Sequence, residues 1–167
     1  MTDDANKSVH AAGTLWLEGE DPEMVAAITE AQRTFGQYRE ELQREARRAA
    51  PAVEDHGVKV FFPHPNDPGA GEHMRVNDVD FGGKQMRGTL FNDAGWLAGL
   101  AAGARVSFTA DRVSDWFFVR NGAVHGGFTI KVVLRRLTPE QFALYRDDPP
   151  ACYFAVWYAQ QQPNPGA

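Results

Sequence analysis

The clearest feature of the sequence is a helical repeat of apolar residues between Asp21 and Pro51. Asp21 is a favourable N-cap, and Pro22 follows at the first helical position, where a missing N–H is tolerated. Steps of three and four residues place the apolar side chains on one stripe of a helix. Pro51 predicts the end of this helix, because proline interrupts the hydrogen-bond ladder. The stripe consists of Met24, Ile28, Ala31, Phe35, Tyr38, Leu42 and Ala46.

A stripe this regular needs an apolar surface to cover it. Most helices in proteins gain their stability from packing of that face against the rest of the domain. We therefore expect the stripe to lie on a sheet formed by the same chain. Pairing of the stripe with a second copy, which would make the protein a homodimer, stays open as an alternative.

From Val58 onward the apolar pattern changes to the two-residue alternation of β-strands. Pairs of turn residues separate the strands, and Asn121-Gly122 is the strongest hairpin signal among them. A bulge or a close backbone approach is expected at Gly126-Gly127. Sequential strands with short turns usually pair antiparallel, and glycine pairs favour strong curvature. The predicted strands are 58–62, 73–81, 85–91, 105–109, 113–120 and 123–134, with a loop over 63–71.

The C-terminal part adds one short helix, which Thr138 and Pro139 begin and which should end near Asp147. The predicted fold class is therefore α+β: a long N-terminal amphipathic helix packed on a strongly curved, mostly antiparallel sheet, like a half-open small barrel, with a short C-terminal helix. A chain of 167 residues fits one domain, which we place at 14–158 between disordered tails at 1–13 and 159–167. The apolar segment 152–158 is either a last strand or a patch for a partner.

Composition narrows the classes of function. The formal net charge of −5 works against binding to a phosphate backbone, so nucleic acid is an unfavourable partner. The single cysteine, Cys152, excludes an internal disulfide and a cysteine-rich zinc site. No apolar run approaches the roughly 20 residues that cross a bilayer, and the first residues do not form a signal peptide. We therefore expect a cytoplasmic protein with no membrane partner, metal or cofactor.

Four short motifs stand out in the strand region. They are Glu72-His73-Met74-Arg75-Val76, Gly88-Thr89-Leu90-Phe91-Asn92, Val113-Ser114-Asp115-Trp116 and Gly126-Gly127-Phe128-Thr129. In order and spacing these motifs resemble the bacterial family catalogued as domain of unknown function 2314, over roughly residues 57–137. The resemblance implies a small α+β domain with a curved sheet, and it implies no activity. The chain departs from the family at Arg75, where an aromatic residue is expected, and at Ala94, where proline is expected.

One hypothesis for function is a small metal-dependent or acid/base hydrolase. Such an enzyme would require its histidines and aspartates to converge within about 4–6 Å in a cleft. The commoner role of a Ser-Asp pair such as Ser114-Asp115 is to accept or donate local backbone hydrogen bonds. The weak candidates for catalysis are His73, Asp78, Asp115 and His125.

The favoured hypothesis is a non-enzymatic domain that binds another protein, for example an immunity or accessory protein that blocks a toxin. Two patches are predicted to carry the binding. The first is the apolar C-terminal segment, with Tyr153, Phe154, Trp157 and Tyr158. The second is a turn that faces the glycine bulge, formed by Ser114, Asp115, Trp116, Gly126 and Gly127.

A further alternative is oligonucleotide binding on the curved sheet. Small curved sheets bind single strands by stacking bases on exposed aromatic side chains. This hypothesis needs the aromatic residues of the central strands to be accessible, and the acidity of the chain opposes it. The aromatic candidates are Phe108, Trp116, Phe117, Phe118 and Phe128.

Overall fold

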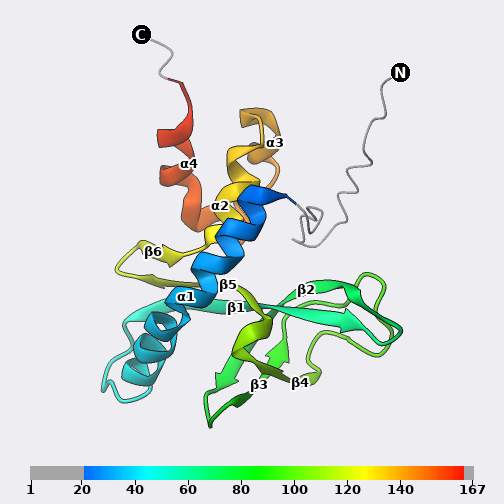
Figure 1. Cartoon of the computed structure of the whole chain (residues 1–167). Helices are drawn as coiled ribbons and strands as arrows, with labels where there is room; N and C mark the ends of the chain where they lie inside the picture. The colour runs from blue at the N-terminus through cyan, green and yellow to red at the C-terminus, as the bar shows by residue number, and fades with distance from the viewer. Residues whose placement is uncertain (1–20, 164–167) are drawn as a thin grey trace, which may run out of the picture.

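The computed structural model describes residues 21–163 and confirms the α+β prediction (Figure 1). Six strands form one curved, open antiparallel sheet in the order β4-β3-β2-β1-β5-β6. The predicted tail at 1–13 and residues 164–167 of the second tail lie outside the described residues. The elements are α1 Pro22–Glu45, β1 Val53–His64, β2 Asp67–Asp80, β3 Gln85–Leu90, β4 Arg105–Thr109, η1 Ala110–Arg112, β5 Val113–Arg120, β6 Ala123–Gly126, α2 Phe128–Arg135, α3 Pro139–Ala143, η2 Ala151–Phe154 and α4 Ala155–Gln161.

Helix α1 begins as predicted, because the Asp21 carboxylate accepts the backbone N–H groups of Glu23 and Met24 at 3.0 and 3.4 Å. It ends earlier than Pro51. The Glu45 carboxylate in its last turn accepts the N–H groups of Ala52 and Val53, which directs the chain into β1.

The middle of the predicted stripe, from Ala31 to Leu42, packs on one face of the sheet (Figure 1). Its first members, Met24 and Ile28, pack on α2, and its last member, Ala46, is exposed beyond the end of α1. Trp116 of β5 is the main contact. Its indole N–H donates to the carbonyl of Ala31 at 3.0 Å, and its ring centre lies 5.9 Å from that of Tyr38. This direct contact between helix and sheet buries the Trp116 side chain and satisfies its polar atom at the same time.

The first hairpin is longer than the sequence suggested. The predicted loop over 63–71 is wrong, because β1 and β2 continue through most of it and only Pro65 and Asn66 connect them. Gly71 makes the extension feasible, since a Cβ there would lie 2.3 Å from the carbonyl oxygen of Phe62. A register shift between Asn77 and Asp80 and a positive φ of 51° at Asp78 mark an irregularity near the end of β2.

The predicted strand over 123–134 is wrong beyond Gly126. Gly126 and Gly127 have φ values of 79° and 69°, which turn the chain sharply out of β6 and into helix α2. The expected close backbone approach is confirmed, because a Cβ on Gly126 would lie 2.1 Å from the carbonyl oxygen of Trp116. The apolar run after Phe128 fits a strand or a short buried helix equally well, so its pattern could not distinguish between these two structures.

Asp115 of β5 caps the start of α2, an interaction that the local sequence pattern does not show. Its carboxylate accepts the N–H groups of the first three helical residues, Phe128, Thr129 and Ile130, at 2.8–3.2 Å, and also the Thr129 hydroxyl at 2.6 Å. A helix start leaves these N–H groups without partners inside the helix. An aspartate from a distant strand therefore acts as the cap of α2, and Asp115 itself is 1% exposed.

The C-terminal segment is helical. The strand interpretation of residues 152–158 is wrong, since η2 and α4 occupy them, and α3 ends at Ala143 rather than near Asp147. Ala151, Phe154 and Tyr158 are spaced three and four apart and are buried in a second apolar cluster. The Tyr158 ring stacks on Phe142 at 4.0 Å between centres, so this segment closes the core around α2 and α3.

Replacing the capping carboxylate should destabilise the whole domain. We expect Asp115→Ala to lower the free energy of unfolding by about 3 kcal/mol, because several buried N–H groups lose their acceptor. Asp115→Asn keeps one acceptor oxygen and should cost less. Denaturant titration followed by circular dichroism measures both changes, with the exposed Asp147→Ala as the matched control. A loss for Asp115→Ala no larger than the control's would contradict the capping role.

Candidate functional site

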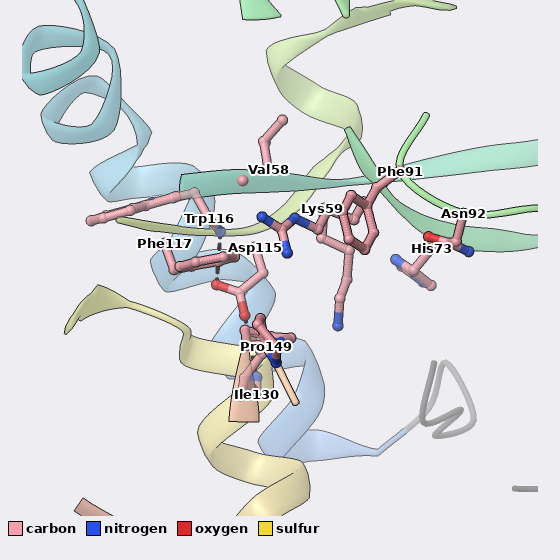
Figure 2. Close-up of a pocket in the computed structure, with 13 residues that line it drawn as sticks. Val58, Lys59, His73, Phe91, Asn92, Asp115, Trp116, Phe117, Ile130 and Pro149 are labelled. Atoms are coloured by element: carbon pink, nitrogen blue, oxygen red, sulfur yellow. Dashed lines mark hydrogen bonds between the residues drawn. The ribbon is translucent and has the colours of Figure 1, made fainter. Parts of the chain in front are cut away.

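A small pocket lies on the face of the sheet opposite α1 (Figure 2). Successive residues of a strand point to opposite faces. In β1, Val58 is buried in the core with α1, whereas Lys59 faces the pocket side together with its cross-strand neighbours Arg75 and Asp115. The cavity measures about 100 Å³. Its lining is Gly57, Val58, Lys59, His73, Arg75, Phe91, Asn92, Asp115, Trp116, Phe117, Ile130, Pro149 and Pro150.

Arg75 forms a rigid wall of the pocket. Its Nη2 donates to the Asp55 carboxylate and to the carbonyl of His56, both at 2.9 Å, and its Nε donates to Asn77 at 2.9 Å. The guanidinium also lies 4.4 Å from the ring centre of Phe91 and 5.0 Å from that of Phe117. At this position, where the resemblance led us to expect an aromatic residue, the chain places a flat cation between two aromatic rings.

Gly57 makes room for this arrangement. A Cβ at this position would lie 2.7 Å from the Arg75 Nε and 3.2 Å from the Phe117 ring. Any side chain at position 57 would push the Arg75 guanidinium out of its position between the two rings. The glycine therefore serves the geometry of the pocket, and its φ angle plays no part.

Lys59 contributes a second cation. Its Nζ donates to the Thr129 hydroxyl at 3.1 Å and forms no ion pair with a carboxylate in the part of the chain that the structure describes. Burial lowers the pKa of the Lys59 ammonium, and the nearby Asp115 charge opposes that shift. A half-buried cation with a single neutral partner is poorly satisfied, because an ammonium offers three donors.

His73 adds a neutral polar group. Its Nδ1 lies 2.9 Å from the Ser114 hydroxyl, which also lies 3.3 Å from the carbonyl oxygen of Lys59. Burial, with a smaller contribution from Lys59, lowers the pKa of His73 to about 4. His73 and Ser114 resemble a base beside a nucleophile, but Ser114 is buried inside β5 and is held by backbone, so a substrate would not reach it.

The loop that follows β3, residues 91–104 and here called the β3–β4 loop, forms the outer rim. The loop is irregular and is held by Glu72. The buried Glu72 carboxylate accepts the N–H groups of Gly95, Trp96 and Leu97 at 2.7–3.1 Å. Two backbone hydrogen bonds, Ala94 to Leu100 and Gly103 to Leu90, close the loop on itself.

Two aromatic side chains of this loop point into solvent. Phe91 is 55% exposed and stacks on Arg75, and Trp96 is 52% exposed and stacks on His64 with 5.5 Å between ring centres. Sequence reasoning missed Glu72 and this loop. The available signal was the position of Glu72, which falls in the same alternation as the buried Met74 and Val76.

The four weak catalytic candidates do not form one cluster. His73 and Asp115 both line the pocket, whereas Asp78 lies beside His56 at the end of α1, and His125 stacks on Phe118 at 4.6 Å. Asp115 is already saturated by backbone and hydroxyl donors, so it is a poor base or metal ligand. Within residues 21–163, no group of three or more His, Cys, Asp or Glu side chains is arranged to hold a metal ion.

The predicted binding residues lie mainly inside the protein. Ser114, Asp115 and Trp116 belong to the middle of β5 rather than to a surface turn, and all three are buried. Gly126 and Gly127 pack against Trp116 and Phe154. In the C-terminal segment, Phe154 and Tyr158 are core residues, whereas Tyr153 and Trp157 are half-buried. Asp115 and Trp116 line the pocket, and the residues of the C-terminal segment belong to the second apolar cluster.

The aromatic residues proposed for stacking on oligonucleotides are similarly placed. Phe108, Trp116, Phe117 and Phe118 are buried, and Phe128 is half-buried against Trp116. Buried rings cannot stack on bases. Among the described helices, none combines the length and the apolar character that crossing a membrane would require.

The low pKa of His73 should make stability depend on pH. The folded state keeps His73 neutral down to about pH 4, whereas in the unfolded chain it takes up a proton near 6.5. The unfolded state therefore binds more protons between these values, so the free energy of unfolding should fall as the pH falls from 7 to 4. We expect His73 to contribute up to about 3 kcal/mol of that fall.

His73→Gln tests this contribution. Burial also lowers the pKa of His56, which adds a slope of the same sign in both proteins, so the relevant quantity is the difference between the two slopes. Denaturant titrations at several pH values should give a shallower dependence for the variant below pH 6.5. Parallel curves for the two proteins would contradict the assignment.

The chain is similar to a family of bacterial proteins. A family model described as "Uncharacterized protein conserved in bacteria (DUF2314)" matches residues 21–148, which extends the resemblance seen over 57–137 to include all of α1. No solved structure matches.

Two curated bacterial relatives are also similar. The "Putative ankyrin repeat protein NMB1133/NMB1171" of Neisseria meningitidis serogroup B is 36% identical over 127 residues, which is 75% of this chain and 50% of that protein. The "Uncharacterized protein YegJ" of Escherichia coli K12 is 29% identical over 68 residues, which is 41% of this chain and 44% of that protein. The chain thus spans half or less of the curated relatives it matches. From the extent of the family match, the chain belongs to the DUF2314 family of bacterial proteins.

Proposed function

We propose that this protein is a non-enzymatic, cytoplasmic protein-interaction domain that binds its partner through the β3–β4 loop and the adjoining pocket. The observation that carries this proposal is the buried Glu72 carboxylate. All of its hydrogen bonds are accepted from the backbone N–H groups of Gly95, Trp96 and Leu97. The loop fixed in this way holds Phe91 and Trp96 in solvent.

Rigid, exposed aromatic side chains are typical of binding surfaces. Large aromatic residues supply most of the energy at many protein interfaces, and a loop that is ordered beforehand loses little freedom on binding. Phe91 is held by Arg75 and Trp96 by His64, so neither ring needs a partner to fix its position. A loop with no binding role would gain more by burying these rings than by exposing them.

The chemistry of the pocket supports binding over catalysis. Its carboxylate, Asp115, is occupied as a helix cap, and its serine neighbour, Ser114, is buried within a strand. A hydrolase would need at least one of these groups free to touch a substrate. The pocket also holds the Lys59 and Arg75 cations, whose donors suit recognition of an acceptor.

The Neisseria relative supports a setting in protein recognition, since its name refers to ankyrin repeats, and repeat proteins of that kind present extended binding surfaces. An immunity or accessory protein that occupies a toxin or another partner is one concrete form of this function. A small acidic domain with a preformed aromatic loop fits such a role.

Removing either exposed ring should weaken partner capture without unfolding the domain. We expect Phe91→Ala and Trp96→Ala each to weaken binding by about 10-fold or more, as alanine does at aromatic anchors of interfaces. The measurement is quantitative capture from lysate of the source bacterium, with identification by mass spectrometry and affinities then determined for the purified partner. Val156→Ala, at a side chain that is 73% exposed on α4, is the matched control. Equal capture by the wild type and both loop variants would remove the loop from consideration.

A further inference from the structure

We propose that the pocket binds the carboxylate of an acidic side chain of the partner protein, between the Lys59 ammonium and the Arg75 guanidinium. This inference rests on the proposed interaction function and names the chemistry of its recognition. It is carried by the size of the cavity, by its unused hydrogen-bond donors and by the local balance of charge.

The size of the cavity selects a side-chain terminus rather than a whole metabolite. Pockets that enclose small-molecule ligands usually measure about 300–1,000 Å³. The cavity beside Lys59 measures about 100 Å³, which is well below that range. A carboxylate and the methylene that carries it fit this space, and the rest of such a ligand would lie outside, against Phe91.

The two cations of the pocket keep unused donors. Of the three donors on Lys59, one is used by the Thr129 hydroxyl. Arg75 uses its Nε and Nη2, and its Nη1 has no hydrogen-bond partner among the described residues. Lys59 and Arg75 are directly opposite each other in the β1–β2 ladder, and such pairs have Cβ atoms about 5 Å apart. One carboxylate can therefore accept from both cations.

The direct contacts of the pocket leave one cation without a paired anion. Arg75 pairs with Asp55, and the Asp115 carboxylate, whose charge acts on Lys59 from a distance, accepts its five hydrogen bonds from the start of α2 and from Trp116. The Lys59 charge is left without an ion-pair partner in the described part of the chain. The chain as a whole carries a net charge of −5. A carboxylate would be repelled by most of this protein and accepted here, which gives the contact specificity.

The experiment uses the full chain and probes that require no knowledge of the partner. We titrate four probes at matched ionic strength. The first is glutamate blocked at both ends, as N-acetyl glutamate N-methylamide, and the others are sodium acetate, sodium phosphate and sodium chloride. Amide and side-chain resonances of Arg75, Phe91 and Asn92 are followed by 1H–15N NMR. We expect blocked glutamate and acetate to shift them saturably with dissociation constants in the range of about 1–100 mM, as befits one small polar contact.

Two lysine variants provide the comparison. Lys59→Met should weaken the binding of blocked glutamate by about 10-fold or more, because one charge-assisted hydrogen bond is lost. Lys131→Met is the matched control, since Lys131 is also a half-buried lysine near Asp115 but does not line the cavity, and it should bind as the wild type does. If the spectrum of Lys59→Met shows an unfolded chain, Lys59→Gln replaces it.

Three results would overturn the inference: no saturable shift with blocked glutamate, the same affinity in Lys59→Met as in the wild type, or equal binding of phosphate. If the first result came with binding of acetate, the ligand would be a free small carboxylate. The outcome is independent of partner capture through Phe91 and Trp96. A negative titration with intact capture by the loop would refute the carboxylate site alone, and the reverse would refute the proposed function alone.

Discussion

The Asp115 carboxylate is the interaction on which the rest of the structure depends. It sits in the middle of β5 and accepts the first backbone N–H groups of α2, so it joins the centre of the sheet to the start of the C-terminal half. The apolar side chains of α2 then pack against α1, and the last helices close around them. The same residue places Thr129 opposite Lys59, so the cap that holds the fold together also forms the floor of the pocket.

Alternation along the strands separates two functions on one sheet. The side chains of Val58, Val76 and Trp116 face α1 and make the core, and their immediate neighbours in sequence face the pocket. Because every second residue is assigned to the core, the polar set on the other face can change without repacking the interior. The departure at Arg75 illustrates this freedom. A cation stands where an aromatic residue was expected, and Gly57 and two rings accommodate it.

Local periodicity predicted most of the fold. The stripe of α1, the antiparallel pairing and the Asn121-Gly122 turn depend on neighbours in sequence, and all three are confirmed, with both turn residues at positive φ. The wrong predictions concern segments whose secondary structure depends on a group far away in the sequence. Residues after Phe128 become a helix because Asp115 caps them from another strand, and residues 152–158 become helical because they pack on Phe142.

The site was harder to predict than the fold for the same reason. Asp115 was expected to accept backbone hydrogen bonds, and the structure confirms this. Asp115 was predicted to lie on a surface turn, whereas it is buried in β5. The spacing of residues in the sequence does not show how deeply a residue is buried. Lys59 and Glu72 carry no motif of their own. Their importance arises from the Thr129 hydroxyl and from the backbone of the β3–β4 loop, which lie far from them in sequence.

The anchoring of the β3–β4 loop by Glu72 has a kinetic consequence. The conformational entropy of the loop is lost during folding, when the carboxylate takes up the three backbone N–H groups, rather than at the moment of encounter. A partner would then meet a surface that is already in its bound shape, so association would proceed as the docking of two rigid bodies. Its rate would be set by diffusion and by orientation, and the lifetime of the complex would report directly on the contacts made.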